Sequence, residues 1–210
     1  MHKLNLDEII KCLSLVASIL HDQPEKALQE LRIISKKVDD QVPYYDGHMQ
    51  RVTEYSLLIG RKLGLPDDDL MKLEAAGLLH DFGKIGIDEE LLLKTGKLTP
   101  EERAEIQNHV IKGVHILMGF EEFNEIVDGI RHHQEYWDGS GYPEGLTGEN
   151  ISLIGRIIAI ADSYDAMTSE RPYRKAKTKE YAINELKKNI GKQFDPKLVE
   201  IFIKELKDIE

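Results

Sequence analysis

Hydrophobic residues along this chain recur mostly every three or four positions, which is the period of an α-helix. They form one stripe in residues 6–20 and a second from Pro24 to Val38, and the same spacing returns in residues 47–63. No run alternates between apolar and polar residues for long enough to predict a β-strand. The pattern therefore predicts an all-α fold.

Residues that begin and end helices support this prediction. Gly64 follows the third segment as a C-cap, whereas Thr99 and Asp195 each precede a proline and are typical of helix starts. Residues 153–169 are apolar on nearly every side. This composition predicts a central, buried helix.

A long irregular segment, residues 134–150, interrupts the helical pattern and is rich in glycine. Long ordered loops in compact domains are often functional. On this interpretation residues 43–210 form one domain, a bundle of about eight helices. Residues 1–42 form an N-terminal helical extension.

Composition and charge narrow the range of functions. The net charge of -10 argues against a long nucleic acid as ligand, because phosphate contacts need a basic face. No apolar run approaches the roughly 20 residues of a membrane span, and the N-terminal segment has the stripe of an amphipathic helix rather than the form of a signal peptide. The single cysteine, Cys12, gives no sign of an oxidised, secreted protein. We expect a cytoplasmic location.

Candidate chemistry is concentrated in histidine and aspartate residues. Five histidines lie within predicted helices or at their ends: His48, His80, His109, His132 and His133. Imidazole and carboxylate groups are ligands for divalent metals such as Mn²⁺, Fe²⁺ and Zn²⁺. Because neighbouring helical residues point about 100° apart, His80 and Asp81 are placed to serve two ions, with Asp81 bridging them. The cations would compensate the charge of a buried aspartate.

Each of these residues has a structural alternative. A lone histidine is more often a surface or core residue than a metal ligand, and we interpret His2, His21 and His115 in that way. Asp162 lies in an apolar helix with no room for an unpaired charge, and its alternatives are a buried salt bridge and a helix cap. The occurrence of several such residues on separate helices favours a metal site.

The order of these residues, with "HDFGK" at 80–84 and "GYP" at 141–143, resembles the HD-GYP subgroup of the HD phosphohydrolase superfamily. The resemblance also includes "GHMQRV", "HHQEYWDGSGYPEGL" and "IADSYDAMTSERPYRKA". It implies an HD-domain helical bundle and a metal-dependent phosphodiesterase. Such an enzyme hydrolyses cyclic di-GMP to linear pGpG, and in some members to GMP, with a metal-bridging water or hydroxide as nucleophile.

The resemblance further implies roles for particular residues. It implies these metal ligands: His48, His80, Asp81, His109, His132, His133 and Asp162. It implies that Lys84 contacts the scissile phosphate, where a cation offsets charge in the transition state, and that Arg171 and Arg174 hold the phosphate and guanine of the ligand. The expected cofactors are two divalent ions, iron or manganese, with zinc and nickel as open alternatives.

Tyr44 departs from the pattern of the subgroup. Some members carry a glutamate four residues before the first histidine ligand, where it helps to hold a third metal. A phenol is a poor ligand for a hard divalent ion, so we expect two metals. Whether hydrolysis stops at pGpG or continues to GMP stays open.

The loop at 141–143 and the N-terminal extension have several open interpretations. The loop residues suit turn geometry, the resemblance implies docking of a protein partner there in some members, and Tyr142 or Trp137 is placed to stack on a guanine. The extension is interpreted either as an element for homodimerisation or as a helical lid.

Two other functions stay open at this stage. One is a different HD-superfamily nucleotide phosphohydrolase, and the other is a catalytically inactive module that binds cyclic dinucleotides or a partner. The complete "GYP" and "RPYR" segments favour cyclic di-GMP as substrate. Intact His80, Asp81 and Lys84 favour an enzyme, because an inactive module is free to lose them.

Overall fold

The computed structural model describes residues 5–41, 47–170 and 175–208, which form eleven α-helices and three short 3₁₀ helices. The longer helices are α1 (Leu6–Leu20), α2 (Pro24–Asp39), α3 (His48–Leu63), α4 (Asp67–Leu79), α9 (Leu153–Thr168), α10 (Lys179–Lys188) and α11 (Pro196–Asp208). The shorter ones are η1 (Phe82–Gly86), α5 (Glu89–Leu92), α6 (Pro100–Gln107), α7 (His109–Leu117), η2 (Glu121–Phe123), α8 (Asn124–His132) and η3 (Gly148–Asn150). No β-strand occurs within the described ranges, and the predicted all-α fold is confirmed.

Side-chain caps explain where several of these helices begin. Asn5 accepts a hydrogen bond from the backbone N–H of Glu8, whose carboxylate accepts one from the backbone of Asn5. Thr99 and Glu102 form the same reciprocal arrangement before α6. Asp195 accepts a hydrogen bond from a backbone N–H in the first turn of α11. The helix starts predicted at Thr99 and Asp195 are therefore present in the structure.

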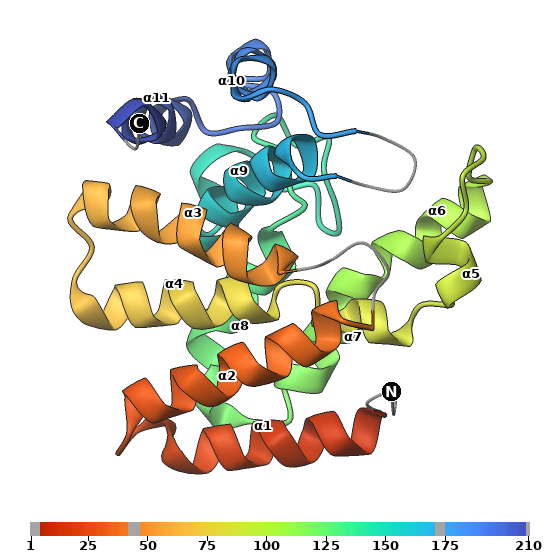
Figure 1. The fold of residues 1–210 in the computed structure, drawn as a ribbon, viewed down its shortest axis with the longest axis vertical. Coiled ribbons are helices and arrows are strands. Elements are labelled where there is room, and N and C mark those ends of the chain that lie inside the picture. The colour runs from red at the N-terminus through yellow and green to blue at the C-terminus, as the bar shows by residue number, and fades with distance from the viewer. Residues whose placement is uncertain (1–4, 42–46, 171–174, 209–210) are drawn as a thin grey trace.

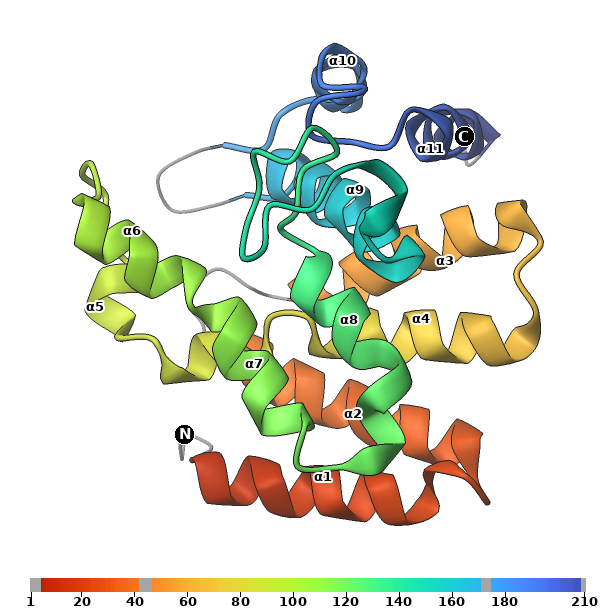
Figure 2. The same cartoon turned by 180° about the vertical axis from the view of Figure 1, so that it is seen from behind.

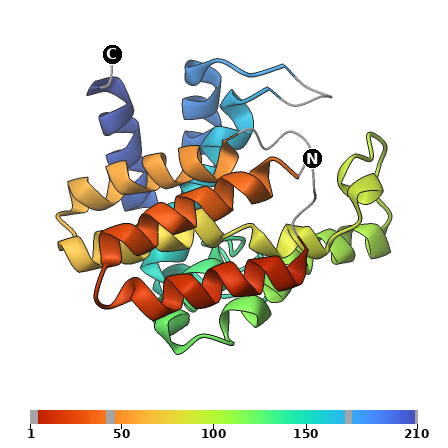
Figure 3. The ribbon, with the colours of Figure 1, turned by 60° about the horizontal axis from the view of Figure 1, so that its bottom comes forward.

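Several of the helices pack in pairs. Figure 1 shows α1 and α2 as one antiparallel pair and α3 and α4 as a second pair above it, with α10 and α11 beyond α9. Viewed from behind, α7 and α8 lie across the other side of the bundle (Figure 2). Figure 3, in which the lower side of Figure 1 is turned toward the viewer, shows α1 and α2 side by side across the front of the molecule. This arrangement points α3, α4, α7, α8 and α9 toward one central region.

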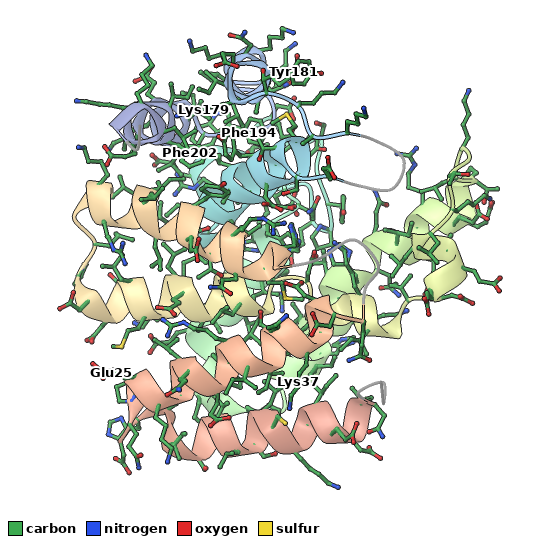
Figure 4. All side chains as sticks on the ribbon, in the orientation of Figure 1. Glu25, Lys37, Lys179, Tyr181, Phe194 and Phe202 are labelled. Atoms are coloured by element: carbon green, nitrogen blue, oxygen red, sulfur yellow. The ribbon has the colours of Figure 1, made fainter. Side chains whose placement is uncertain are left out.

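One continuous hydrophobic core extends from Ile9 on α1 to Leu206 on α11. Where α3, α9 and α11 meet, Tyr55 and Phe202 both pack edge to face on Tyr164 of α9, with ring centroids 5.0 and 5.2 Å away. Phe202 and Phe194 lie where α10 and α11 meet α9 (Figure 4). Because Ile9 and its neighbours on α1 belong to the same core, the N-terminal helices pack directly on the bundle.

The structure contains more helices than the pattern predicts, for local reasons. The segment after Thr99 is divided at Asn108, where α6 ends and α7 begins, and α5 is only one turn long. The helix that leads to His80 does not continue to Lys84, because Gly83 in η1 lies against the backbone of α7. None of the described helices is both long and apolar enough to cross a membrane.

Candidate metal centre

The first of two groups of potential metal ligands contains His48, His80 and Asp162. His48 begins α3, His80 directly follows α4, and Asp162 lies in the middle of α9. One ligand atom from each lies within 4.8 Å of the other two. The Nε2 atom of His48 is 3.5 Å from Oδ1 of Asp162. The start of α3, the end of α4 and the middle of the remote α9 thus bring these polar residues to one point.

The second group contains Asp81, His109 and His133. Asp81 follows His80, His109 begins α7, and His133 directly follows α8. The Oδ1 atom of Asp81 lies 3.2 Å from Nε2 of His109 and 3.8 Å from Nε2 of His133. All three residues are buried.

Asp81 lies between the two groups. Its Oδ2 atom is 3.5 Å from Nε2 of His48 and 3.5 Å from Nε2 of His80, whereas its Oδ1 atom faces the second group. The two oxygens of one carboxylate therefore face different sets of imidazoles. This geometry suits a carboxylate that bridges two cations.

The orientation of the imidazole rings is fixed by hydrogen bonds on their outer side. In three of these histidines, Nδ1 lies 2.7 Å from the backbone carbonyl oxygen of the residue three positions earlier. The pairs are His80 with Gly77, His109 with Ile106, and His133 with Ile130. A carbonyl oxygen only accepts, so each Nδ1 carries the proton and each Nε2 presents its lone pair to the centre. This is the tautomer that a metal ligand requires.

His48 is oriented by a carboxylate instead. Its Nδ1 atom lies 2.7 Å from Oδ2 of Asp165, one turn after Asp162 on α9. Arg51 donates to both oxygens of Asp165, and Ser169 donates to Oδ1 at 3.0 Å. Burial opposes ionisation of Asp165, but the hydrogen bonds from His48 and Arg51 lower its pKa to about 2.

Burial is the largest influence on the pKa values of several groups at the centre. Burial lowers the pKa of His80, and it lowers the pKa of His133 to about 3. Burial would raise the pKa of Asp81, yet the Lys84 ammonium and the surrounding histidines hold it well below its usual range. Neutral imidazoles at His80 and His133 thus lie near an ionised carboxylate at Asp81, and these are the forms that bind metals.

These residues fit divalent cations. The Nε2 atom of His80 is buried, and no residue within the described parts of the chain forms a hydrogen bond with it. Buried polar atoms are rarely left without a partner, so an inward-facing imidazole nitrogen beside two carboxylates fits the ligand set of a divalent cation. Imidazole and carboxylate ligands together suit iron, manganese, zinc and nickel.

His132 does not join either group, although the resemblance implies that it is a ligand. Its Nδ1 atom accepts a hydrogen bond of 3.2 Å from the backbone N–H of Ser152, and its Nε2 atom is 3.9 Å from Glu144. Consecutive residues point in different directions around a helix end, so His133 turns inward while His132 faces α9. The described geometry therefore gathers six of the seven expected ligands.

The other candidate residues lie at varying distances from the centre. Lys84 forms an ion pair with Oδ2 of Asp81. Tyr142 is partly buried, and its pKa is raised by burial and, to a lesser extent, by the charges of Asp81 and Asp162. Trp137 stacks instead beneath Arg156, with 5.8 Å between the guanidinium and the ring. Tyr44, Arg171 and Arg174 lie outside the described residues.

Two buried carboxylates near the site escape the sequence analysis. Asp165 orients His48, and the argument that singles out Asp162, a charge within an apolar helix, applies equally to it. Glu135 accepts hydrogen bonds from three successive backbone N–H groups in the loop that contains "GYP", those of Glu144, Gly145 and Leu146. The periodicity of the sequence gives no indication of the role of Glu135, because it follows the end of α8.

A helical bundle whose facing helices direct buried imidazoles and carboxylates at one region is a common setting for a metal site. The chain belongs to the HD domain family, whose model matches residues 32–198. The chain is 36% identical over 202 residues to the cyclic di-GMP phosphodiesterase response regulator RpfG of Xanthomonas campestris, covering 92% of this chain and 53% of that protein. It is 41% identical over 167 residues to a cyclic di-GMP phosphodiesterase of Thermotoga maritima, covering 77% of this chain and 45% of the relative.

Other relatives act on a different cyclic dinucleotide. The chain is 40% identical over 161 residues to 3'3'-cGAMP-specific phosphodiesterase 3 of Vibrio cholerae, covering 77% of this chain and 35% of the relative. These relatives confirm the resemblance to the HD-GYP group, while this chain spans between about a third and about half of their length.

Two solved structures share the fold. A cyclic GMP-AMP phosphodiesterase of V. cholerae superposes with a TM-score of 0.65 at 24% identity, over 86% of this chain and 49% of that chain. An HD-GYP-type protein from Bdellovibrio bacteriovorus, Bd1817, gives a TM-score of 0.66 at 20% identity, over 96% of this chain and 71% of that chain. Both confirm the HD-type helical architecture.

Proposed function

We propose that this chain is a metal-dependent phosphodiesterase that hydrolyses cyclic di-GMP. The observation that supports this most is the position of Asp81, whose two oxygens face separate groups of imidazoles with their Nε2 atoms turned inward. We propose His48, His80 and Asp162 as ligands of one cation and His109 and His133 as ligands of the other, with Asp81 shared. Iron or manganese is the proposed metal.

The residues of the chain have distinct roles in this proposal. Divalent cations, when bound, lower the pKa of a water molecule and neutralise phosphate charge. Asp165 and the backbone carbonyls keep Nε2 of each histidine directed at the centre. The ammonium group of Lys84 lies beside Asp81, where it stabilises negative charge that develops on the phosphate oxygens. Tyr142 is close enough to Asp81 and Asp162 for their charges to raise its pKa, and we propose that it contacts the substrate.

The proposal also selects one cyclic dinucleotide as the substrate. The names of the Xanthomonas and Thermotoga relatives support cyclic di-GMP, whereas a V. cholerae relative of similar identity supports 3'3'-cGAMP as the second candidate. The proposed contacts of Arg171 and Arg174 with phosphate and guanine lie outside the described residues. Release of pGpG or GMP, a partner at the GYP loop, a homodimer and a cytoplasmic location stay predictions from the sequence.

A substrate panel tests the proposal. The full chain loaded with Mn²⁺ or Fe²⁺ is mixed with cyclic di-GMP, 3'3'-cGAMP and a mononucleotide, and the products are separated by chromatography. Preferential turnover of cyclic di-GMP is expected, and turnover restricted to 3'3'-cGAMP or to the mononucleotide would reject the substrate assignment. Asp81→Asn should abolish turnover, and Asp68→Asn, an exposed aspartate in the first turn of α4, is the matched control.

A further inference from the structure

Asp39 is a buried carboxylate that the proposed metal centre does not include. It is the last residue of α2 and is only 2% exposed. Its location is unfavourable in two respects, because burial penalises the charge and because the C-terminal end of a helix carries partial negative charge. Burial accordingly raises the pKa of Asp39 to about 7. A residue kept in such a place needs a specific partner.

That partner is the beginning of α3. The Oδ2 atom of Asp39 accepts a hydrogen bond of 3.1 Å from the backbone N–H of Met49, the second residue of the helix. The N-cap residue of α3 is Gly47, which has a φ of 67° and no side chain that could cap the helix. Asp39 therefore supplies, from another helix, the cap that α3 lacks. Its carboxylate also faces the positive end of the α3 dipole.

The capped helix end carries the first ligand of the centre, because His48 immediately precedes Met49. The ring of His48 is held by Asp165, while the backbone beside it is held by Asp39. One carboxylate, from α9, thus holds the side chain of His48, and the other, from α2, holds the backbone next to it. A shift of the α3 start would move Nε2 of His48 relative to Asp81 and Asp162.

Helix α2 is itself firmly anchored to the bundle. It packs against both α3 and α4, the two helices that lead to His48 and His80. Arg32 in its middle forms an ion pair with Glu74, which is buried on α4. Glu25 and Lys37 mark the two ends of α2 in Figure 4, and the helix runs along the lower side of the α3 and α4 pair. Asp39 at its end is therefore a fixed point of attachment for α3.

We propose that Asp39 is a positioning residue of the metal centre. By capping α3 from α2 it sets the place of His48, so that the N-terminal helical segment is part of the machinery that binds the metal. This inference rests on the proposed function for the identity of the centre. It assigns a role to a residue outside every motif that the sequence analysis uses.

The test compares three variants of the full chain, with the Mn²⁺ dissociation constant measured by calorimetry. Asp39→Ala should raise the dissociation constant about tenfold, as loss of an outer-shell partner of a ligand does. Asp39→Asn keeps an oxygen that accepts the Met49 N–H, and it should bind Mn²⁺ nearly as the wild type does. Asp40→Ala removes the exposed neighbouring aspartate, which pairs with Lys36, and should change nothing. Circular dichroism and thermal unfolding confirm that each variant is folded.

Several outcomes would overturn the inference. One is an Asp39→Ala dissociation constant equal to that of Asp40→Ala, and another is a folded Asp39→Asn variant that loses affinity tenfold. The second outcome also decides the case if Asp39→Ala does not fold. If the wild type itself binds no Mn²⁺, the proposed function fails separately, and amide hydrogen exchange at Met49 by NMR then decides. Faster exchange in Asp39→Ala but not in Asp39→Asn supports the cap, and equal exchange rejects it.

Discussion

The Nδ1 atom of His48 lies 2.7 Å from Oδ2 of Asp165, and this contact joins α3 to α9 at the centre of the bundle. Asp165 is 1% exposed and also receives hydrogen bonds from Arg51 and Ser169. Its carboxylate therefore fixes the direction of the His48 ring and keeps the proton on Nδ1. The first group of potential ligands depends on a residue that would not itself touch a metal.

Replacing Asp165 tests this dependence. Asp165→Asn is expected to weaken Mn²⁺ binding by about tenfold to a hundredfold, because the amide no longer enforces protonation of His48 at Nδ1. Calorimetric titration of the metal-free protein measures the change. Asp195→Asn is a matched control, since Asp195 is also buried and paired with an arginine, Arg156, but caps α11 away from the centre. A loss of affinity in the control of the same size would contradict a specific role for Asp165.

Metal binding should release a proton from His48. Burial alone would lower the pKa of His48, but hydrogen bonds to Asp165 and Asp81 outweigh it and raise the pKa to about 9 in the metal-free protein. A raised pKa means that the imidazole is protonated below that pH and must lose its proton before it binds a cation. Affinity should therefore fall as the pH falls below about 9. Calorimetry in buffers of different ionisation enthalpy counts the protons, and a count that does not decline as the pH rises toward 9 would reject this prediction.

Much of the site follows from short-range geometry that a sequence contains. His80 and Asp81 are neighbours at a helix end, so their side chains diverge, and each belongs to a different group of potential ligands, with Asp81 also facing His80. Asp162 stands out because an apolar helix seldom carries a lone charge. The caps at Thr99 and Asp195 are equally local, since each acts on residues two or three positions ahead.

The parts that could not be predicted depend on packing between distant segments. Which of His132 and His133 faces the centre is set by the rotation of α8 about its axis, and that rotation is fixed where His132 packs tightly on Gly155 of α9. The cap that Asp39 gives to α3 joins the end of one helix to the start of another, so no spacing rule identifies it. Which helix end a buried carboxylate caps is decided by how the helices pack in the folded protein.

Gly83 should be intolerant of any side chain. A Cβ atom there would overlap the carbonyl oxygen of His109 and approach the backbone nitrogen of Gly113 to 2.5 Å. Gly83→Ala must therefore separate η1 from α7, and we expect a loss of about 1–3 kcal/mol in the free energy of unfolding. Because η1 follows Asp81 and α7 begins at His109, the same change should weaken metal binding. Denaturant titration and calorimetry measure the two effects.

The control for this prediction is Gly96→Ala. Gly96 is exposed, its added Cβ would meet nothing within 4 Å, and its backbone φ is not positive. This variant should match the wild type in both measurements. A Gly83→Ala variant as stable and as tight in Mn²⁺ binding as the Gly96→Ala variant would show that η1 and α7 separate without cost.

Glu135 should hold the loop that contains Tyr142 in position without changing the affinity for metal ions. Its buried carboxylate accepts hydrogen bonds from the backbone N–H groups of Glu144, Gly145 and Leu146, at 2.6, 3.1 and 3.1 Å, and no other residue within the described ranges accepts from these three groups.

Removing that carboxylate in Glu135→Ala leaves these N–H groups to water and should cost about 1–3 kcal/mol of stability. The KM for cyclic dinucleotide should rise as Tyr142 loses its fixed position, while the Mn²⁺ dissociation constant stays unchanged because neither ligand group contains Glu135. Glu149→Ala, an exposed glutamate of the following η3, should leave KM and stability at wild-type values. Steady-state kinetics and calorimetry together separate the two roles, and a weakened Mn²⁺ affinity with an unchanged KM would mean that Glu135 supports the centre rather than the loop.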